Sequence, residues 1–342
     1  MLRLSRSVTL SIAALVLVAA CDAGPLLPSA PSSVAPPTEL GAGADLAIGL
    51  SLPGPDPDPF LATVVDAAKA RATELGSVEL DIVDAADKAD TQLEQVAALL
   101  EAGVDALIVV PVDAAATDPI RDLAAGADVP LVWLNRRPYD LAPDGSTPFV
   151  GSDSLQDGTL EMQALSDRIG GRGGVAVLMG DPLTEAAVVR TEGCKDVVAS
   201  HPDLRVTREQ VAGHSRDRAG EVVTAWLTDP NTRIDAICAN DDELALGAIQ
   251  ALADAERLDG VAVGGVGGMA EALDAMVAGT LAATVFEDAA GQGRTAVETA
   301  AALARGRSVE TVEGSILLPG ELVTPDNMHD YLGRNVPPVP GG

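Results

Sequence analysis

The sequence predicts an α/β protein with two similar lobes, each built on a parallel β-sheet with helices on both faces. From Ala44 onward, short apolar runs rich in Val, Ile and Leu alternate with amphipathic helical stretches. Continuous apolar strands need cover on both faces, and parallel strands are joined by helical crossovers, so this alternation indicates parallel sheets. The order of helix, Asp-Ala and apolar strand in residues 94–113 recurs in residues 221–242, which favours two lobes of related topology.

The first half of this alternation is predicted from apolar spacing and from helix-ending residues. In the stretch 59–75, Leu61, Val64 and Ala68 recur at helical spacing and share one face. Gly103 follows the next amphipathic stretch, and a glycine in this place is typical of a helix end. The expected strands are residues 46–50, 78–83, 105–110 and 130–134, and the expected helices are residues 59–75, 90–101 and 120–125.

The pattern restarts after Phe149-Val150-Gly151. In open parallel sheets the ligand lies beyond the carboxyl ends of the strands, so two such sheets facing each other predict a cleft between the lobes. The expected strands of this half are residues 175–179, 206–211, 234–239 and 261–263. Its expected helices are residues 155–169, 185–200, a segment ending at Leu227, 244–255 and 269–277.

The N-terminus has the pattern of an export signal. Arg3 and Arg6 precede residues 10–20, which are almost entirely apolar. A basic region followed by a short apolar region is typical of a secretory signal peptide, and this apolar region is too short for a typical membrane-spanning helix. We therefore predict a signal peptide over residues 1–20.

Cys21 follows two small residues, Ala19 and Ala20. This ending resembles the lipobox of bacterial lipoproteins, in which the cysteine is diacylated and becomes the mature N-terminus; the alternative is ordinary cleavage after Ala20. Residues 22–43 are rich in proline and lack apolar periodicity, which is typical of a flexible tether. We therefore expect a lipidated cysteine and a disordered tether over residues 21–43, and anchoring to the outer face of the cytoplasmic membrane.

The composition excludes several classes of partner and chemistry. With 51 acidic and 22 basic residues, a formal net charge of −29 disfavours nucleic acid and anionic lipid surfaces. The spacing of Cys194 and Cys238 matches no metal signature. An exported location permits a disulfide between them, and two buried free thiols are the alternative. Trp133 and Trp226 lie on apolar faces and are expected in the core. We expect no metal and no cofactor, and since no nucleophile–base pair is evident, no enzyme.

Seven short motifs together carry a family resemblance. They are IGLS (48–51) leading to Asp58-Pro59-Phe60, PLVWLNR (130–136), VGSD (150–153), RTEG (190–193), NDDELALGA (240–248), LAATV (281–285) and LVTPDN (322–327). In these motifs the chain from Ala44 to about Leu332 resembles the periplasmic sugar-binding family of the ribose, galactose and inositol type.

The resemblance implies the type I periplasmic binding protein fold, whose two lobes are joined by a three-segment hinge. The crossings are expected near residues 149–152, 286–289 and 313–316, an arrangement that lets the lobes close while limiting their twist. The implied N-terminal lobe is residues 44–149 plus 288–313. The implied C-terminal lobe is residues 150–287 plus 314–332, and residues 333–342 are expected to form a disordered tail.

The resemblance also implies a ligand site at the strand ends of both lobes. Carboxylates accept hydrogen bonds from hydroxyl pairs, the planar guanidinium fork donates in a fixed geometry, and an aromatic ring can cover an apolar C–H face. This set therefore suits a polyhydroxylated ligand. The expected ligand-binding residues are Asp58, Phe60, Asn135 and Arg136 from the first lobe and Arg190, His214, Asp241 and Glu287 from the second.

Most of the polar candidates have a purely structural alternative. Asp58 precedes a proline, where an aspartate often serves a turn or a helix cap. Asn135 and Arg136 follow a strand, where charge often marks the exit to solvent. Arg190 could lie on a solvated helix face, and Asp241 could only cap the next helix.

The chain also departs from the family pattern. Residues 264–266 read Gly-Gly-Val where many members have Gly-Phe-Asp, so an expected sugar-binding carboxylate is missing. His214 occupies a place that is often aromatic, and Leu61 follows Phe60 where a second aromatic is common. Because of these departures, the resemblance implies the scaffold but no specific sugar.

We therefore expect an extracytoplasmic solute-binding protein, acting as a monomer, that captures a sugar or polyol between its lobes and delivers it to the membrane permease of an ABC-type importer. One alternative is a sensor subunit that presents its ligand to a membrane receptor. Another is a binder of nucleosides or other polar solutes on the same scaffold. A sugar-responsive transcription regulator would need an N-terminal DNA-binding module, and the predicted signal peptide and tether occupy that place.

Cys21→Ala should release the protein from membranes, because it removes the thiol that would carry the lipid. Fractionation of expressing cells followed by immunoblotting measures the distribution, with Cys194→Ala as a matched control that should stay membrane-bound. A Cys21→Ala protein that remains in the membrane fraction would contradict the lipid anchor.

Overall fold

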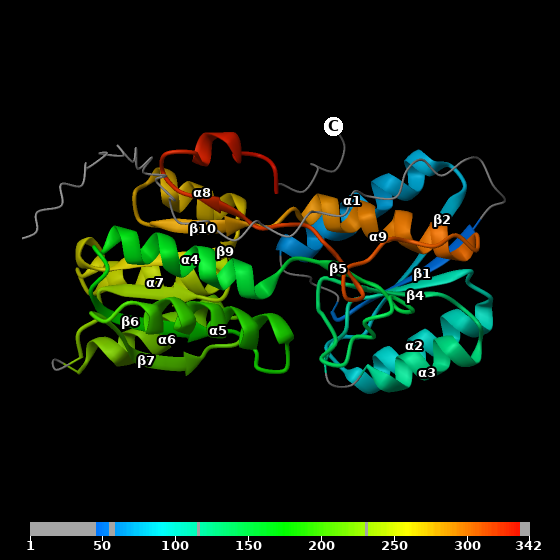
Figure 1. Cartoon of the computed structure of the whole chain (residues 1–342), viewed down its shortest axis with the longest axis horizontal. Coiled ribbons are helices and arrows are strands. Elements are labelled where there is room, and N and C mark those ends of the chain that lie inside the picture. Colours follow the sequence, from blue (N-terminus) through cyan, green and yellow to red (C-terminus); the bar gives the residue numbers. More distant parts are fainter. Residues whose placement is uncertain (1–45, 55–58, 115–116, 230–231, 336–342) are drawn as a thin grey trace, which may run out of the picture. The chain divides into compact units, whose positions relative to one another are not determined.

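The computed structural model describes residues 46–54, 59–114, 117–229 and 232–335 (Figure 1). Within these ranges the chain forms two six-stranded sheets, each the centre of an α/β lobe, as predicted. The predicted signal peptide, Cys21, the tether, Asp58 and residues 336–342 lie outside the described ranges.

The first sheet is parallel throughout, in the order β2-β1-β3-β4-β5-β11. Helices α1 and α9 pack together on one face, and α2 and α3 pack on the other (Figure 1). The strands are β1 (Leu46–Leu52), β2 (Val78–Asp84), β3 (Ala106–Val109), β4 (Leu131–Leu134), β5 (Phe149–Gly151) and β11 (Ser315–Leu317). The helices are α1 (Pro59–Leu75), α2 (Ala89–Ala102), α3 (Asp118–Gly126) and α9 (Ala289–Ala304).

Alternate side chains of this sheet enter two separate cores. In β3, Ile108 packs with α1 and α9, whereas Leu107 and Val109 pack toward α2 and α3. Trp133 of β4 is fully buried in the second of these cores, as predicted. Burial on both sides explains why central strands such as β3 and β4 are apolar at successive positions, whereas the edge strand β2 alternates with acidic residues.

The second sheet has the order β12-β10-β9-β8-β6-β7. Its strands are β6 (Gly173–Met179), β7 (Leu204–Val211), β8 (Ala236–Ala239), β9 (Ala262–Gly267), β10 (Ala283–Phe286) and β12 (Glu321–Val323). Its helices are α4 (Ser154–Arg168), α5 (Glu185–Ser200), α6 (Arg216–Leu227), α7 (Asp242–Asp254) and α8 (Ala270–Val277), with 3-10 turns η1 (Leu258–Gly260) and η2 (Met328–Asp330).

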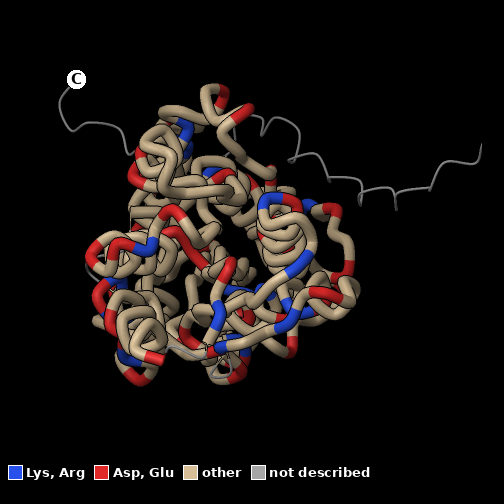
Figure 2. Tube along the Cα trace, turned by 90° about the vertical axis from the view of Figure 1, so that its left-hand side faces the viewer, with Lys and Arg blue, Asp and Glu red and all other residues tan. Residues whose placement is uncertain are grey.

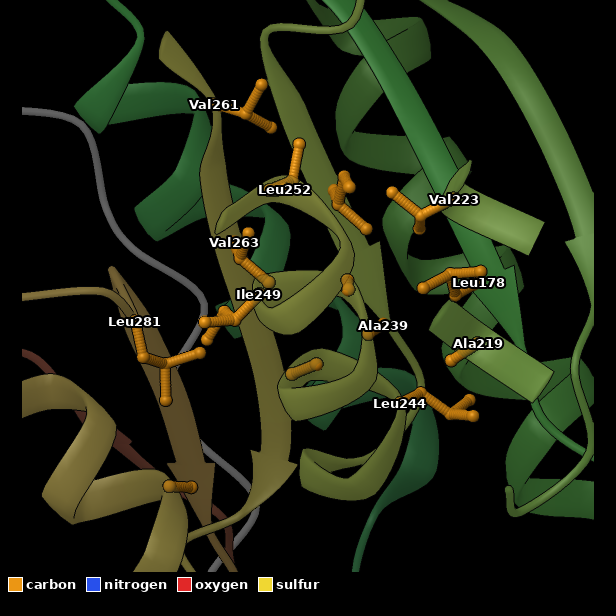
Figure 3. Packing of buried hydrophobic residues seen from close by; sticks show 14 of the residues in the cluster. Leu178, Ala219, Val223, Ala239, Leu244, Ile249, Leu252, Val261, Val263 and Leu281 are labelled. Carbon is orange, nitrogen blue, oxygen red and sulfur yellow. The ribbon is translucent and has the colours of Figure 1, made fainter. Parts of the chain in front are cut away.

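The central strands of this sheet are also buried on both faces. Leu178, Ala239 and Val263, from three neighbouring strands, pack against α6 and α7 in the larger core (Figure 3). Trp226 belongs to the same core and is buried, as predicted. On the opposite face Val177 packs with α4 and α5. The parallel order of the sheet ends at β12, which pairs antiparallel with β10. The chain reaches that edge from β11 without a helical crossover, and such antiparallel edge strands are common in otherwise parallel sheets.

The last crossing between the lobes lies later in the chain than expected. Ser315–Leu317 forms β11, which pairs with β5 in the first sheet, so the assignment of residues 314–332 to the second lobe does not hold for this strand. The chain passes to the second sheet between Leu317 and Glu321. The reason is the free edge of β5, whose backbone groups are paired by the short apolar run that follows Gly314.

Three residues of the expected disordered tail are ordered. Gly333, Arg334 and Asn335 are part of the described structure, and Asn335 is only 5% exposed. Its side-chain amide donates to two backbone carbonyls of the second lobe, those of Gly267 and Glu287. These two hydrogen bonds attach residues 333–335 to the second lobe, although the composition of this segment is typical of a solvent-exposed terminus.

Cys194 and Cys238 are two buried free thiols and do not form a disulfide. Cys238 Sγ donates to Glu161 Oε2 at 3.1 Å, and Glu161 Oε1 accepts from the backbone N–H of Ala239 at 2.8 Å. Complete burial raises the pKa of the Glu161 carboxyl to about 8. The thiol thus sits in a polar contact inside the second lobe.

Acidic positions are spread along the whole described trace (Figure 2). Most are exposed or half-buried, as expected for solvated charge. Among the described residues, the buried acids are Asp157, Glu161, Asp242 and Glu287. All of them lie on second-lobe elements or at the crossing after β10, and their burial marks a region where the protein itself must satisfy charged groups.

The close approach of α1 and α9 depends on Gly293. A methyl group on this glycine would lie 2.1 Å from the carbonyl oxygen of Val64. Gly293→Ala should therefore lower the free energy of unfolding by about 1–3 kcal/mol, as overpacking does. Gly126→Ala is the matched control, because open space surrounds that helical glycine and alanine there should change stability by no more than about 1 kcal/mol, in the stabilising direction. Urea denaturation measures both, and equal effects would contradict the packing argument.

Candidate ligand-binding site

A cleft with about 710 Å³ of empty space, partly open to solvent, lies among residues that follow the carboxyl ends of strands. The first lobe contributes the start of α1 and the residues after β4, and the second contributes residues after β6, β7, β8, β9 and β10. The cleft is lined by Phe60, Asn135, Arg136, Arg190, His214, Asp241 and Glu287, which are all the predicted site residues that the structure describes.

The first-lobe residues are held by the turn that follows β4. Asn135 has a left-handed backbone conformation (φ 61°), and its side-chain Nδ2 donates to Gln292 Oε1 on α9 at 3.1 Å. Arg136 Nη1 donates to the carbonyl oxygen of Pro111 at 3.1 Å. Both side chains are half-buried, so the strand end does not simply lead to solvent. Phe60, in the first turn of α1, is buried and supplies the aromatic surface of this side.

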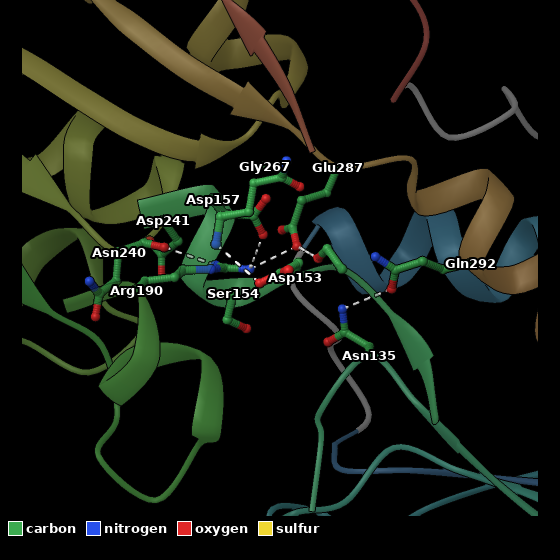
Figure 4. Close-up of polar contacts among 12 residues, drawn as sticks. Asn135, Asp153, Ser154, Asp157, Arg190, Asn240, Asp241, Gly267, Glu287 and Gln292 are labelled. Atoms are coloured by element: carbon green, nitrogen blue, oxygen red, sulfur yellow. Dashed lines mark hydrogen bonds and ion pairs between the residues drawn. The ribbon is translucent and has the colours of Figure 1, made fainter. Parts of the chain in front are cut away.

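Arg190 projects from α5 toward the interior of the second lobe and not onto a solvated helix face. Its Nη1 donates to the carbonyl oxygen of Asn240 at 2.9 Å, and its Nη2 contacts Glu287 Oε1 at 2.8 Å (Figure 4). The side chain is only 12% exposed. A guanidinium this deeply buried needs an anionic partner, and Glu287 is that partner.

Glu287 comes directly after β10, where the chain crosses to α9. Its Oε1 also accepts a hydrogen bond from the hydroxyl of Ser152, which follows β5 at another crossing. Asp157 of α4 lies near the same nitrogen of Arg190, with its Oδ2 3.9 Å from Nη2. Burial, and secondarily the charge of Glu287, raises the pKa of Asp157 well above its ordinary value. Arg190, Glu287 and Asp157 therefore form a buried cluster at the wall of the cleft, in which burial favours the neutral form of the Asp157 carboxyl (Figure 4).

Asp241 performs two tasks with its two oxygens. Oδ1 accepts from the backbone N–H of Leu244 at 2.8 Å, so the residue does cap α7. Oδ2 contacts His214 Nδ1 at 2.8 Å, and the half-exposed His214 side chain thereby lines the same cleft. Asp241 can therefore cap α7 and line the cleft at once, because α7 begins directly after the carboxyl end of β8, where the cleft lies.

Several residues that line the cleft were not predicted. Asp242, Val266, Gly267 and Met269 contribute to its second-lobe wall, with Thr184, Ala186 and Glu243. Asp242 is the one fully buried carboxyl among these newly found lining residues. The run Asn-Asp-Asp-Glu at residues 240–243 contains two aspartates. Of these two, only Asp241, at the strand end, is among the predicted site residues.

Asp242 also explains the glycine-rich departure at residues 264–266. A methyl group on Gly265 would lie 2.5 Å from Asp242 Oδ1, so the space that a larger side chain would need is taken by this carboxyl. The Asp242 oxygens accept from the backbone N–H of Met269 at 2.8 Å and from the hydroxyl of Thr284 at 2.7 Å. Complete burial raises the pKa of the Asp242 carboxyl to about 7. The carboxyl therefore braces the turn between β9 and α8 that forms one wall of the cleft.

Comparison with known protein families matches residues 48–308 to the periplasmic binding protein domain. The match spans most of the chain, and the chain belongs to this family. The predicted family and fold class are confirmed: the two lobes built on parallel sheets are those of a type I periplasmic binding protein.

Individual proteins give the same picture. A Rhizobium meliloti protein named for rhizopine binding is 39% identical over 269 residues, which cover 77% of this chain and 85% of that protein. The xylitol-binding protein of Mycolicibacterium smegmatis is 32% identical over 254 residues, covering 74% of this chain and 70% of that protein. A crystal structure of an ABC transporter solute-binding protein from Bacillus halodurans with bound myo-inositol is 35% identical, with a TM-score of 0.80, and covers 86% of this chain and all of that one.

The buried Asp242 carboxyl should make stability depend on pH. Its pKa is about 7 in the folded chain and about 3.8 when unfolded, so the folded state binds more protons between these values and stability falls as pH rises from about 4 to 7. Asp242→Asn mimics the protonated form, so its stability advantage over the parent should grow by up to about 1.4 kcal/mol per pH unit across this window. Urea denaturation at pH 5 and pH 8 measures this, with the exposed Asp274→Asn as control. An advantage that does not grow with pH would contradict the raised pKa.

Proposed function

We propose that the protein is an extracytoplasmic solute-binding protein that captures a sugar or polyol in the cleft and delivers it to an ABC-type importer. The observation that carries this proposal is the convergence of polar strand-end residues from both sheets on one small-molecule cleft. Ligand contacts from two separate lobes couple binding to the relative position of the lobes, which is what hinge closure requires.

The chemistry of the cleft favours a neutral polyhydroxylated ligand. Arg190 and Glu287 neutralise each other, and Asp241 and His214 are paired, so the cleft offers donors and acceptors more than uncompensated charge. Phe60, Val266 and Met269 add an apolar surface suited to C–H faces. Xylitol and myo-inositol, named with two of the similar proteins, are both polyols, and this supports a polyol over an amino acid.

The remaining parts of the proposal concern the membrane. We infer export through the signal peptide, lipid attachment at Cys21, anchoring to the outer face of the cytoplasmic membrane and action as a monomer; the N-terminal sequence supports the first three. Among the helices that the structure describes, none is both long and apolar enough to cross a membrane.

A thermal-shift screen tests the ligand class, using the chain from Ala44 to Gly342 against myo-inositol, xylitol, D-ribose, D-galactose, amino acids and nucleosides. A ligand that binds only the folded state at about 100 times its Kd adds about 2.7 kcal/mol of stability, a shift of several degrees. We expect a shift with a polyol or sugar. A shift with amino acids or nucleosides alone would keep the scaffold and contradict the ligand class.

The same screen tests the site through variants. Arg136→Ala and Asp241→Asn should weaken binding by about 10- to 100-fold, the usual effect of losing a charged hydrogen bond. Asparagine at position 241 still caps α7, so this loss would reflect the cleft and not the helix. The exposed Arg307→Ala and Asp274→Asn are matched controls that should bind as the parent does. Unchanged affinity in both cleft variants would contradict the site.

A further inference from the structure

The C-terminal segment contacts the cleft wall from outside. Asn335 lies beyond the last 3-10 turn, yet its side chain is buried. Its hydrogen-bond partners are 48 and 68 residues away in the sequence. Its Nδ2 donates to the carbonyl oxygen of Glu287 at 2.7 Å and to that of Gly267 at 2.9 Å. Both protons of one amide group are thus used on two separate strand ends, and no other orientation of the amide satisfies these two acceptors.

The two carbonyls belong to residues that line the cleft. Gly267 ends β9, and Glu287 follows β10 at the crossing toward α9. The two residues are also joined to each other, because the backbone N–H of Glu287 points to the carbonyl oxygen of Gly267 at the longer distance of 3.3 Å. The Glu287 carboxylate in turn pairs with Arg190 (Figure 4) and accepts a hydrogen bond from the Ser152 hydroxyl. Asn335 therefore bonds to the backbone that sets the position of the Glu287 carboxylate.

The segment is itself anchored to the second lobe. The rings of Tyr331 and Phe286 are 5.3 Å apart, and the Arg334 guanidinium lies 4.2 Å from the Phe286 ring centre. The hydroxyl of Tyr331 donates to Glu321 of β12 at 2.8 Å. Asn335 is thus delivered to Gly267 and Glu287 by a segment fixed on the same lobe.

The balance of its hydrogen bonds indicates a positioning role. The Oδ1 of Asn335 is buried and has no hydrogen-bond partner among the described residues. An unpaired buried acceptor costs free energy and offsets part of what the two donated bonds contribute. The distinctive effect of this side chain is therefore to hold two carbonyls in a fixed relation.

We propose that Asn335 is a positioning residue of the ligand site: it fixes the backbone of Gly267 and Glu287, and so the cleft wall and the carboxylate at the crossing after β10. This inference rests on the proposed function. It assigns a role in ligand binding to a residue outside the cleft, in a segment that the sequence places beyond the lobes.

Asn335→Asp tests the inference in the otherwise unchanged chain from Ala44 to Gly342. The substitution keeps the shape but directs carboxylate oxygens at two carbonyl oxygens. We expect the Kd for myo-inositol or xylitol to rise at least tenfold at pH 8, measured by calorimetry at 25 °C. The variant's Kd, divided by that of the parent at each pH, should fall as the pH is lowered, because a protonated carboxyl regains one donor.

Asn327→Asp is the matched control. Asn327 lies in the same C-terminal segment, and its Nδ2 donates to the carbonyl oxygen of Leu322, away from the cleft. This variant should lose stability and keep its Kd within twofold. Circular dichroism at 25 °C verifies that each variant is folded, since a lower stability changes the apparent Kd only through the folded fraction. A folded Asn335→Asp protein with the parent's Kd would overturn the inference.

Hydrogen exchange of the ligand-free proteins separates this inference from the proposed function. The backbone N–H of Glu287 donates to the carbonyl of Gly267 and that of Ala289 donates to the carbonyl of Glu287, and these are the two carbonyls that Asn335 binds. Positioning by Asn335 therefore predicts faster exchange at these two amides in Asn335→Asp than in Asn327→Asp. If no polyol or sugar binds the parent chain, the proposed function fails, and the exchange result still decides whether Asn335 holds this backbone. Equal exchange in the two variants would overturn the inference by itself.

Discussion

The organisation of this protein depends on the burial of parallel strands on both faces. Leu107 and Ile108 are neighbours in β3 and enter different cores, so neither face of the strand has room for a polar side chain. The central strands accordingly carry no charged side chains, and charged groups are placed where these strands end. Because the strands of a parallel sheet end at one edge, residues far apart in the chain, such as Asn135 and Asp241, meet at the same cleft.

Placing charge at these ends has an electrostatic cost that the second lobe offsets internally. Arg190 Nη2 contacts Glu287 and lies 3.9 Å from Asp157, and burial favours the neutral form of the Asp157 carboxyl, so Glu287 is the main balance for the Arg190 charge. Asp242 is treated similarly, with its two oxygens on Met269 and Thr284. These groups are therefore oriented before a ligand arrives, and a polar ligand meets fixed donors and acceptors without first ordering them.

The crossing after β10 joins these features. Glu287 bonds Arg190 and Ser152 through its side chain and Asn335 through its backbone carbonyl. Three segments distant in sequence thus converge on one residue at a lobe crossing. The antiparallel edge strand β12 is part of the same arrangement, because it brings the chain back to the second lobe and leads to the segment that carries Asn335.

The sequence by itself determined the fold class, most of the elements up to α8 and most of the candidate site. The sequence pattern predicts a helix at residues 185–200, where the structure has α5, and predicts that Trp133 and Trp226 are buried. Both predictions succeed because they depend only on residues nearby in the chain. Polar residues at strand ends, such as Arg136 and Asp241, stand out for the same reason. Only the tertiary structure decided that β11 joins the first sheet, that Asp242 fills the space above Gly265, and that Asn335 reaches Glu287. These depend on free sheet edges, on vacant volume and on hydrogen-bond partners 48 or more residues away, none of which leaves a periodic mark in the chain.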